Sequence, residues 1–424
     1  MSDEIAPRHH SGKQRILLIV NITLAVLTIL SGTGLLYANW KLNNRNVVTI
    51  DTVDPNINAF DLPVGDLKAK NFLITGSDNN ACIAKNSRYA GGFGVRSSYG
   101  ERSDSIMVIR VNPIDNQAAV LSFPRDMWVT QAGSTRHGRI NSNFDKKNPN
   151  RLIRTIKENF GIVIDHYVNI DFCAFKEVID AVGGVRVPFV NRSRDTHTGF
   201  RVSTANVCFN FEGDHALAYM RSRHYQWYDR ALKKWRTDQS SDWGRIARQQ
   251  DFMRRLVKKA LDKARTNPRV ATGILNAALK NVITDDRLNP LTVLQLGQAM
   301  KNFDANTMGS YTMPGLGQVI DKASVIVPDF ESDQSKKILS VFQGKASLSS
   351  TLKKTSVSPP SSNFNELTAV IATTSVLRLS VSKPRATTTT TSTSTTSTTT
   401  TVPAVVIEQN ARGIVPPDDP NCQF

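Results

Sequence analysis

Charged and polar residues stand at the ends of several apolar stretches in the middle of this 424-residue chain. Asp78 follows the apolar run NFLIT, Asp104 precedes the run SIMVIRV, and Arg125 and Asp126 follow the run AAVLSF with one Pro between. Proteins built from an α/β sheet usually bind their ligands where the strands end. We therefore expect these side chains to belong to one site.

Three further groups of polar residues have a spacing that suits the same site. Arg139 and Asn141 lie in the polar loop HGRINSNF. Arg221 and Arg223 alternate, so in an extended segment both would point to the same side. Residues at i, i+3 and i+4 share one face of a predicted helix, opposite its apolar stripe: Arg245, Arg248 and Gln249.

A set of arginines is suited to a multiply charged phosphate group, because guanidinium is always charged and can bind oxygen atoms in pairs. Two carboxylates beside them could hold Mg²⁺ through oxygen ligands. Two plainer interpretations compete with this one. An Arg-rich helix face at 245–269 is often only solvated or rests on anionic lipid, and Asp104 and Asp126 could be caps of turns or helices.

Other kinds of site find little support. The chain has no G-x-S-x-G nucleophile elbow, and no close Cys/His cluster has zinc spacing. His166, His215 and His224 have no ligand spacing to each other, so we expect them to be structural.

The elements that must position these residues follow the alternating pattern of an α/β domain over residues 66–345. Apolar runs and turn residues predict strands at 71–75, 105–111, 118–123 and 165–171. Apolar residues at helical spacing predict helices at 151–161, 175–184, 242–265, 269–281 and 290–302. Residues 216–223 are interpreted as a strand or as a short helix-to-strand segment. The expected fold is an α/β domain with a central mixed sheet flanked by helices.

The basic composition points to an anionic partner, since 53 Lys and Arg oppose 36 Asp and Glu, a formal charge of +17. Residues 16–38 carry no charge and are long enough to cross a bilayer. Basic residues precede them, which predicts a cytoplasmic N-terminus and an extracytoplasmic remainder. That topology argues against nucleic acid as the partner. A cleaved signal peptide is the alternative.

The C-terminal part has the composition of an extracellular stalk, because residues 387–401 are only Thr and Ser. Four cysteines could form two disulfides in an oxidising compartment, in any of three pairings. We favour Cys173 with Cys208 and Cys82 with Cys422, although spacing alone does not decide. The expected division of the chain is a basic N-terminus at 1–15, a transmembrane helix at 16–38, a linker at 39–65, the α/β domain at 66–345, a linker with stalk at 346–403 and a tail at 404–424.

Six segments of the domain, in this order, resemble the signature segments of the LytR-CpsA-Psr family: SDSIMVIRVNP, SFPRDMWV, GRINSNF, IDAVGGVRV, ALAYMRSRH and SDWGRIARQQ. The resemblance covers about residues 66–320. It implies a membrane-anchored ligase of cell-wall assembly, which moves a glycopolymer from a polyprenyl-pyrophosphate carrier to peptidoglycan through a phosphodiester.

The resemblance also implies roles for the residues. Asp78 and Asp104 match the carboxylates associated with Mg²⁺ and pyrophosphate, and Asp104 is our candidate base. Asp242 matches a residue that either binds the metal or fixes an arginine. The arginines expected to bind the phosphates, and the other polar residues expected around the pyrophosphate, are Arg125, Arg139, Arg221, Arg223, Arg245, Arg248 and Gln249. A pyrophosphatase at the same site and a non-enzymatic module that holds anionic glycan are the alternatives.

The chain departs from the family pattern in two places. The 18 residues between Arg223 and Asp242 form a longer aromatic and basic insert than expected, which could cover an acceptor glycan, touch lipid head groups or be disordered. Asn79 and Asn80 stand where many relatives carry an arginine nearby.

Overall fold

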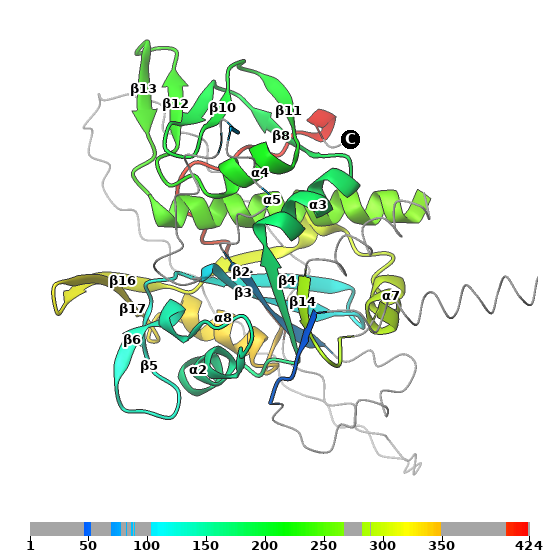
Figure 1. The fold of residues 1–424 in the computed structure, drawn as a ribbon, viewed down its shortest axis with the longest axis vertical. Coiled ribbons are helices and arrows are strands. Elements are labelled where there is room, and N and C mark those ends of the chain that lie inside the picture. Colours follow the sequence, from blue (N-terminus) through cyan, green and yellow to red (C-terminus); the bar gives the residue numbers. More distant parts are fainter. Residues whose placement is uncertain are drawn as a thin grey trace, which may run out of the picture.

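The computed structural model of the protein describes residues 46–51, 69–77, 82, 86, 87, 89, 103–266, 282–288, 290–348 and 404–422. A seven-stranded sheet crosses the middle of the molecule (Figure 1). Its strands, in spatial order, are β1 (Asn46–Val48), β14 (Val282–Asp285), β7 (His166–Asp171), β2 (Lys70–Ser77), β3 (Ser103–Asn112), β4 (Gln117–Phe123) and β15 (Gly309–Thr312). Three neighbouring pairs are parallel and three are antiparallel, so the predicted mixed sheet is confirmed.

Helices cover both faces of this sheet, which explains why its central strands are near-continuous apolar runs. Strand β4 shows this well, because every residue after Gln117 is buried. Helices α2 (Asn150–Phe160) and α8 (Asp333–Phe342) pack on one face through Ile153, Phe160 and Phe342. Helices α5 (Asp242–Thr266) and α7 (Pro290–Ala299) pack on the other face, as Figure 1 shows.

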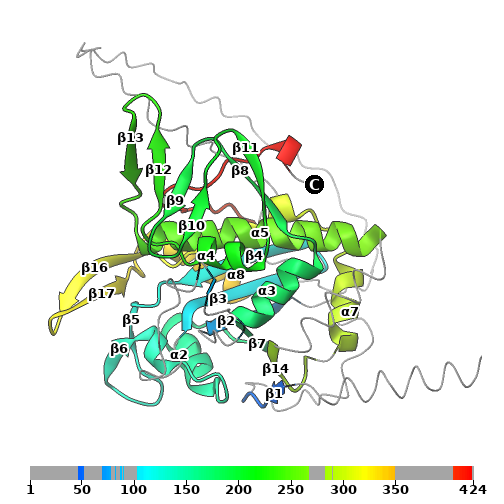
Figure 2. The same ribbon diagram turned by 45° about the horizontal axis from the view of Figure 1, so that its top comes forward.

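Helix α5 also carries a third layer on its far side (Figure 2). This layer contains two helices, α3 (Phe172–Ala181) and α4 (Gly213–Met220), and the paired strands β8 (Val185–Phe189) and β11 (Val207–Phe211). Phe252 and Leu256 of α5 join its aromatic core, whereas Val257 and Leu261 face the large sheet. Helix α5 therefore contributes to two hydrophobic cores, one on each side, and packing in both fixes its position.

The expected helix at 151–161 is confirmed and ends where its glycine predicts. Gly161 lies in the left-handed region at φ +66°, and its amide donates to the carbonyl of Lys157. Gly184, which closes α3 with Gly183, has φ +80°, and a Cβ there would lie 2.7 Å from the carbonyl oxygen of Phe211. Helix α7 confirms the helix expected at 290–302, and the helix expected at 269–281 lies outside the described residues.

The strand interpretation of residues 216–223 is wrong. The segment begins as helix α4, which ends at Met220, and Arg221 to Ser222 then form a turn. Every residue of α4 except Asp214 is buried. A short apolar run buried on all sides has no periodicity that separates strand from helix.

The insert between Arg223 and Asp242 is an ordered hairpin, so the disordered alternative is wrong. Strands β12 (Gln226–Asp229) and β13 (Lys234–Thr237) form it. They join β9 (Ser193–Asp195) and β10 (Phe200–Val202) in a four-stranded sheet. Arginines stack on its rings: Arg192 lies 4.0 Å from the ring centre of Tyr228 and Arg194 lies 4.0 Å from that of Trp235.

The two disulfides join different cysteines from those we favoured. Cys82 pairs with Cys173, and Cys208 pairs with Cys422. The sheet topology explains the pairs. Strand β7 lies beside β2, so Cys173, just after β7, lies close to Cys82 in the chain that follows β2. Cys208 lies instead on β11 in the third layer. The spacing of the cysteines along the sequence shows neither which strands are neighbours nor which layer holds Cys208.

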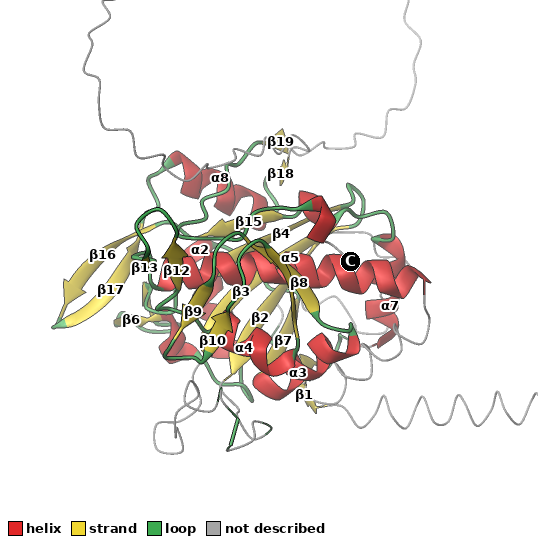
Figure 3. Cartoon of the chain, turned by 90° about the horizontal axis from the view of Figure 1, so that it is seen from above, coloured by secondary structure: helices red, strands yellow, loops and turns green. Residues whose placement is uncertain are grey.

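Residues 404–422, called the C-terminal segment below, run back along the domain. Strand β19 (Ala404–Val405) pairs in parallel with β18 (Ser347–Leu348), as Figure 3 shows beside α8. Asn410 then exchanges two hydrogen bonds with the backbone of Thr312, and the segment ends in the short helix η4 (Pro420–Cys422). The segment is thus anchored at both ends and along its length.

Among the residues that the structure describes, no helix is long and apolar enough to span a membrane. The predicted transmembrane segment at 16–38 and the Thr/Ser stretch at 387–401 lie outside those residues.

Candidate functional site

Most of the polar residues singled out in the sequence belong to elements that meet at one end of the large sheet, where β2, β4 and β7 end and β3 begins. Ser77, the last residue of β2, pairs with Ser103 on β3 and with Asp171 on β7. Asp104 is the second residue of β3, and Asp78 follows Ser77 in the chain. The side chain of Asp104 and the whole of Asp78 lie outside the described structure. We call this end of the sheet the strand-end site.

Gln249 connects the strand-end site to the layer above it. Its side-chain oxygen accepts a hydrogen bond from the Ser105 hydroxyl (3.3 Å), and its amide donates to the carbonyl of Met220 (3.0 Å). The start of β3, helix α5 and the end of α4 therefore meet at this residue. Arg221 follows Met220, so α4 delivers the arginine pair to the strand ends.

Asp242 holds two of the predicted arginines. Its Oδ1 lies 3.1 Å from Nε of Arg223 and 2.9 Å from Nη2 of Arg245. The side chain of Arg245 is 2% exposed and that of Arg223 is 25% exposed, so the pair is partly removed from solvent. One carboxylate thus orients a guanidinium from each side of the α4–α5 connection. This is the second of the two roles that we considered for Asp242, the fixing of an arginine.

Arg221 lies against an aromatic ring at the same end of the sheet. Its guanidinium carbon lies 4.9 Å from the ring centre of Phe172, the first residue of α3. Phe172 follows Asp171, whose partner on β2 is Ser77, so the ring stands at the strand ends. A planar guanidinium that stacks on a ring keeps its N–H groups directed along its edge, where a phosphate oxygen can accept them.

A second pair of predicted arginines shares another carboxylate. Asp126 lies 3.3 Å from Nε of Arg125 and 3.3 Å from Nε of Arg139. Arg139 ends β6 (His137–Arg139), which pairs with β5 (Trp128–Thr130) after the end of β4. Gln250 of α5 donates to the Ser122 hydroxyl of β4 (2.8 Å), which sets the helix against the strand that leads to Arg125. The described contacts of the Asp126 side chain are thus with arginines, a role different from the cap that we considered.

Arg248 faces away from the strand ends and has structural contacts. Its guanidinium is fully buried and donates to Asp238 (2.7 Å) and to the carbonyls of Ser222 and Ile414. It also lies over the ring of Tyr225 at 4.6 Å. The solvated or lipid-facing interpretation of this helix face is wrong for Arg245 and Arg248, because both side chains are buried.

Two buried aspartates that hold this region together had not been singled out. Asp195 accepts hydrogen bonds from the Ser222 hydroxyl (2.8 Å) and the His224 amide (2.9 Å), which fixes the turn that contains Arg223. Asp238 accepts from Arg248, and hydrogen bonds from Ser240 and Arg248 outweigh its burial, so that its pKa is lowered. Nothing in the local sequence marks either residue, because their partners come from other elements.

No group of three acidic, His or Cys side chains that could hold a metal ion occurs in the described part of the chain. Asp242 already faces two guanidinium groups, which compete with a cation for its oxygens. For Asp78 and Asp104, whose side chains lie outside the described structure, the metal assignment stays a prediction.

Comparisons with known proteins show the family and the fold. The model of the LytR_cpsA_psr family matches residues 38–340. Two curated relatives named polyisoprenyl-teichoic acid–peptidoglycan teichoic acid transferase are similar to part of the chain. TagU of Bacillus mycoides (strain KBAB4) is 30% identical over 202 residues, 48% of this chain and 59% of the relative. TagV of Bacillus subtilis (strain 168) is 29% identical over 213 residues, 45% of this chain and 51% of the relative. The matched part thus spans between half and three fifths of these relatives.

Solved structures share the fold. A LytR-Csp2A-Psr enzyme from Actinomyces oris aligns with a TM-score of 0.51 and 20% identity, over 70% of this chain and 96% of that one. The crystal structure of B. subtilis TagV aligns with a TM-score of 0.51 and 24% identity, over 66% of this chain and 98% of that one. At this level of identity the likeness concerns the fold.

Proposed function

Because the chain belongs to the LytR-CpsA-Psr family, we propose that it transfers a glycopolymer from a polyprenyl-pyrophosphate carrier to peptidoglycan at the strand-end site. The observation that carries this proposal is the convergence of arginines from separate elements on the strand ends, where single carboxylates orient them. The names of the curated relatives, teichoic acid transferases, support the reaction class.

The transfer exchanges one P–O bond for another. A hydroxyl oxygen of the acceptor glycan attacks the phosphorus that carries the glycopolymer, and a new P–O bond forms. The bond from that phosphorus to the bridging oxygen breaks, and polyprenyl phosphate leaves with the electron pair. The hydroxyl proton passes to a base, for which Asp104 is our candidate by resemblance.

Electrostatic stabilisation is the main contribution that the described residues make to this reaction. Arg221 and Arg223 are placed to bind the pyrophosphate oxygens, and Arg125 and Arg139 approach from the end of β4. Charge accumulates on these oxygens as the bridging bond breaks, and pre-positioned guanidinium groups stabilise it without further reorganisation. Asp242 and Gln249 fix the relative positions of the elements that carry the arginines, and they act as positioning residues.

We further propose that Mg²⁺ binds with the pyrophosphate through Asp78 and Asp104. Carboxylate oxygens are its preferred protein ligands, and the pairing of Ser77 with Ser103 brings the chain positions next to both aspartates together. When bound, the ion would neutralise phosphate charge. The proposed Mg²⁺ site rests on the family resemblance and on the positions of the two aspartates in the chain.

The location is a proposal too: a single-pass membrane protein with a cytoplasmic N-terminus and an extracytoplasmic domain. The uncharged stretch at 16–38 supports it, as do the two disulfides, since such bonds persist mainly in oxidising compartments.

The test is to incubate the full-length protein with Mg²⁺, a synthetic polyprenyl-pyrophosphoryl oligosaccharide and peptidoglycan fragments, and to analyse the products by mass spectrometry. We expect glycan joined to the acceptor through one phosphate. The variant Arg221→Ala should lose about 10²–10³-fold in rate, the usual cost of one pre-positioned donor. Arg154→Ala, which removes an exposed arginine on α2, is the matched control.

Two results would replace the proposal. Cleavage of the donor without attachment to any acceptor would make the protein a pyrophosphatase. Binding of the donor without cleavage, whatever the acceptor, would make it a glycan-binding module.

A further inference from the structure

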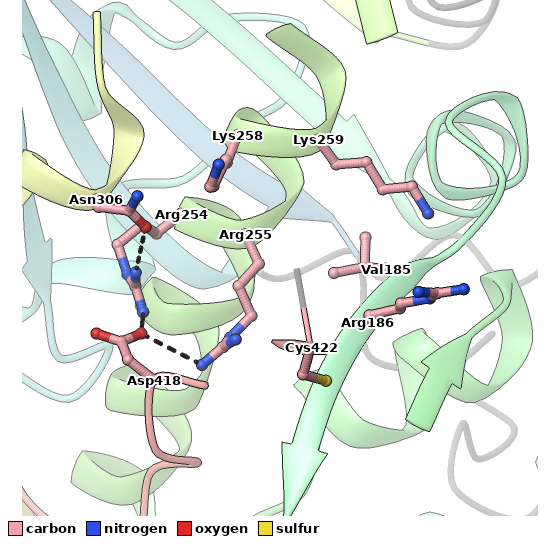
Figure 4. Close-up of a pocket in the computed structure, with 9 residues that line it drawn as sticks. All are labelled: Val185, Arg186, Arg254, Arg255, Lys258, Lys259, Asn306, Asp418 and Cys422. Carbon is pink, nitrogen blue, oxygen red and sulfur yellow. Dashed lines mark hydrogen bonds and ion pairs between the residues drawn. The ribbon is translucent and has the colours of Figure 1, made fainter. Parts of the chain in front are cut away.

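A basic pocket lies away from the strand ends, between the second half of α5, strand β8 and the C-terminal segment (Figure 4). It encloses about 360 Å³, including space open to solvent. Lys259 is ten residues beyond Gln249 on α5, which is about 15 Å along a helix. The pocket is therefore separate from the strand-end site. Its lining residues are Val185, Arg186, Arg254, Arg255, Lys258, Lys259, Asn306, Asp418 and Cys422.

The charges of the lining are strongly unbalanced. Five of these side chains are basic and only Asp418 is acidic, which leaves an excess of four positive charges. Outside the lining, Asp262 pairs with Lys258 at 3.2 Å. Asp251 pairs with Arg254 and Arg255 from behind, so three carboxylates face five cations, and the remaining excess of positive charge attracts anions.

Asp418 shows how the pocket holds an acidic group. Its Oδ1 accepts from Nη2 of Arg254 (2.6 Å) and lies 3.6 Å from Nη2 of Arg255, and the dashed lines in Figure 4 mark both contacts. Behind the two arginines, Asp251 receives Arg254 at 2.6 Å and Arg255 at 2.8 Å. The guanidinium groups are thus fixed in advance and directed at an oxygen-bearing ligand from the chain itself.

The other half of the pocket has cations without such compensation. In the described ion pairs, neither Arg186 of β8 nor Lys259 has a carboxylate partner, and Figure 4 shows the two side chains directed to the same side of the pocket. Burial, and then repulsion from Lys263 and Arg186, lowers the pKa of Lys259 to about 8. The ammonium of Lys259 donates to the carbonyl of Gly183 at 3.1 Å, so its position is fixed. An anion between these groups would relieve the repulsion.

We propose that this pocket binds a phosphate-bearing anion through Arg186 and Lys259, next to the arginines that Asp418 occupies. The site is small and partly open to solvent, since Arg186 is exposed and Lys259 is half-buried, so it suits one or two phosphate groups on a small molecule or a flexible chain. Asp418 acts as an internal competitor, because its carboxylate lowers the positive potential that the ligand meets. The proposal does not depend on the transfer reaction.

The test uses the full-length protein in a background that lacks two of the strand-end arginines, Arg221→Ala with Arg223→Ala, so that binding at that site is weakened and is the same in every variant compared. Inorganic pyrophosphate is titrated by calorimetry at pH 7 and low salt. We expect the added pair Arg186→Ala with Lys259→Ala to weaken binding by at least about tenfold, since charge-assisted hydrogen bonds are lost. Lys337→Ala with Lys345→Ala removes two exposed lysines on and just after α8; it is the charge-matched control and should leave affinity unchanged.

Two further measurements test the roles of Asp418 and Lys259. Asp418→Asn should tighten binding by roughly threefold to tenfold, because it removes a like charge at close range. At pH 8.5, where Lys259 is largely neutral, binding should take up protons, seen as a dependence of the measured heat on the buffer. The charged groups around Lys259 in this titration are Arg186 of β8, Arg255, Lys258 and Lys263 of α5, and Asp418 of the C-terminal segment.

The source of the phosphate is assigned by a second ligand, dihexanoyl phosphatidylglycerol below its micelle concentration. Binding at least tenfold tighter than that of pyrophosphate, lost in the Arg186/Lys259 variant, would assign a lipid head group. Preference for pyrophosphate would assign a free or polymer-borne phosphate. The proposal is overturned if neither ligand binds, if the double variant keeps its affinity within twofold, or if Asp418→Asn weakens binding. Circular dichroism and thermal unfolding of each variant exclude misfolding as the cause of a loss.

Discussion

The substitution Asp238→Ala should unfold the region between α5, the hairpin β12–β13 and the C-terminal segment more than any surface change. Asp238 lies 2.7 Å from the fully buried guanidinium of Arg248 and accepts from the amides of Ser240 and Ile414. Without it, Arg248 stays buried without a counter-charge. Removing one partner of a buried pair costs about 3–5 kcal/mol of unfolding free energy.

The assay is thermal unfolding together with urea denaturation. One kcal/mol shifts Tm by about 2–4 °C in a domain of this size, so we expect a loss of roughly 6–20 °C. Glu331→Gln breaks the exposed pair with Lys336 (3.1 Å) and is the control, which should change stability by less than about 1 kcal/mol. If Asp238→Ala costs as little as this control, the buried pair does not hold the segment and the reasoning is wrong.

The remaining predictions concern pH, the disulfide and the arginine cluster. The pKa of Asp238 is lower in the folded protein than its ordinary value of 3.8. The ionised carboxylate therefore contributes fully to the free energy of unfolding above pH 3.8, and this contribution is lost as the pH falls through the lower folded pKa. Asp238→Asn should flatten this part of the acid unfolding curve. Cys208→Ser with Cys422→Ser should cost about 2–5 kcal/mol in urea denaturation, and an unchanged midpoint would contradict a structural role for this bond. Asp242→Asn should lower the transfer rate by at least about tenfold because Arg223 loses its orientation. Raised Mg²⁺ should not restore that rate, and full recovery would instead make Asp242 a metal ligand.

Local patterns in the sequence predicted most of the large sheet and its helices. The strands β2, β3 and β4 are apolar runs separated by turn residues, and two hydrogen bonds between Asn112 and Asp115 close the turn that joins β3 to β4. The end of α2 follows from Gly161, which adopts a backbone conformation that other residues rarely take. These features depend on residues within a few positions of each other, so they can be predicted from a single sequence.

The candidate site was predicted in its residue types and only partly in its arrangement. Arg221 and Arg223 were expected on a strand or in a short helix-to-strand segment, and they follow a helix that is buried on nearly all sides. Asp242 was considered either for a metal or for an arginine, and only the tertiary contacts show it between two guanidinium groups. Asp195 and Asp238 were not considered at all, since their partners lie in other elements.

Short-range patterns in the sequence predicted the α/β architecture, the family resemblance and the residue types of the strand-end site, because strand and helix periodicity and motif order depend on neighbouring positions. Tertiary structure decided the disulfide pairs, the burial of Arg245 and Arg248, and the course of the C-terminal segment along α5. The contact of Asp238 with Ile414, 176 residues apart, shows the reason. Such partners meet only after the layers have packed, and no local pattern encodes which distant segments become neighbours.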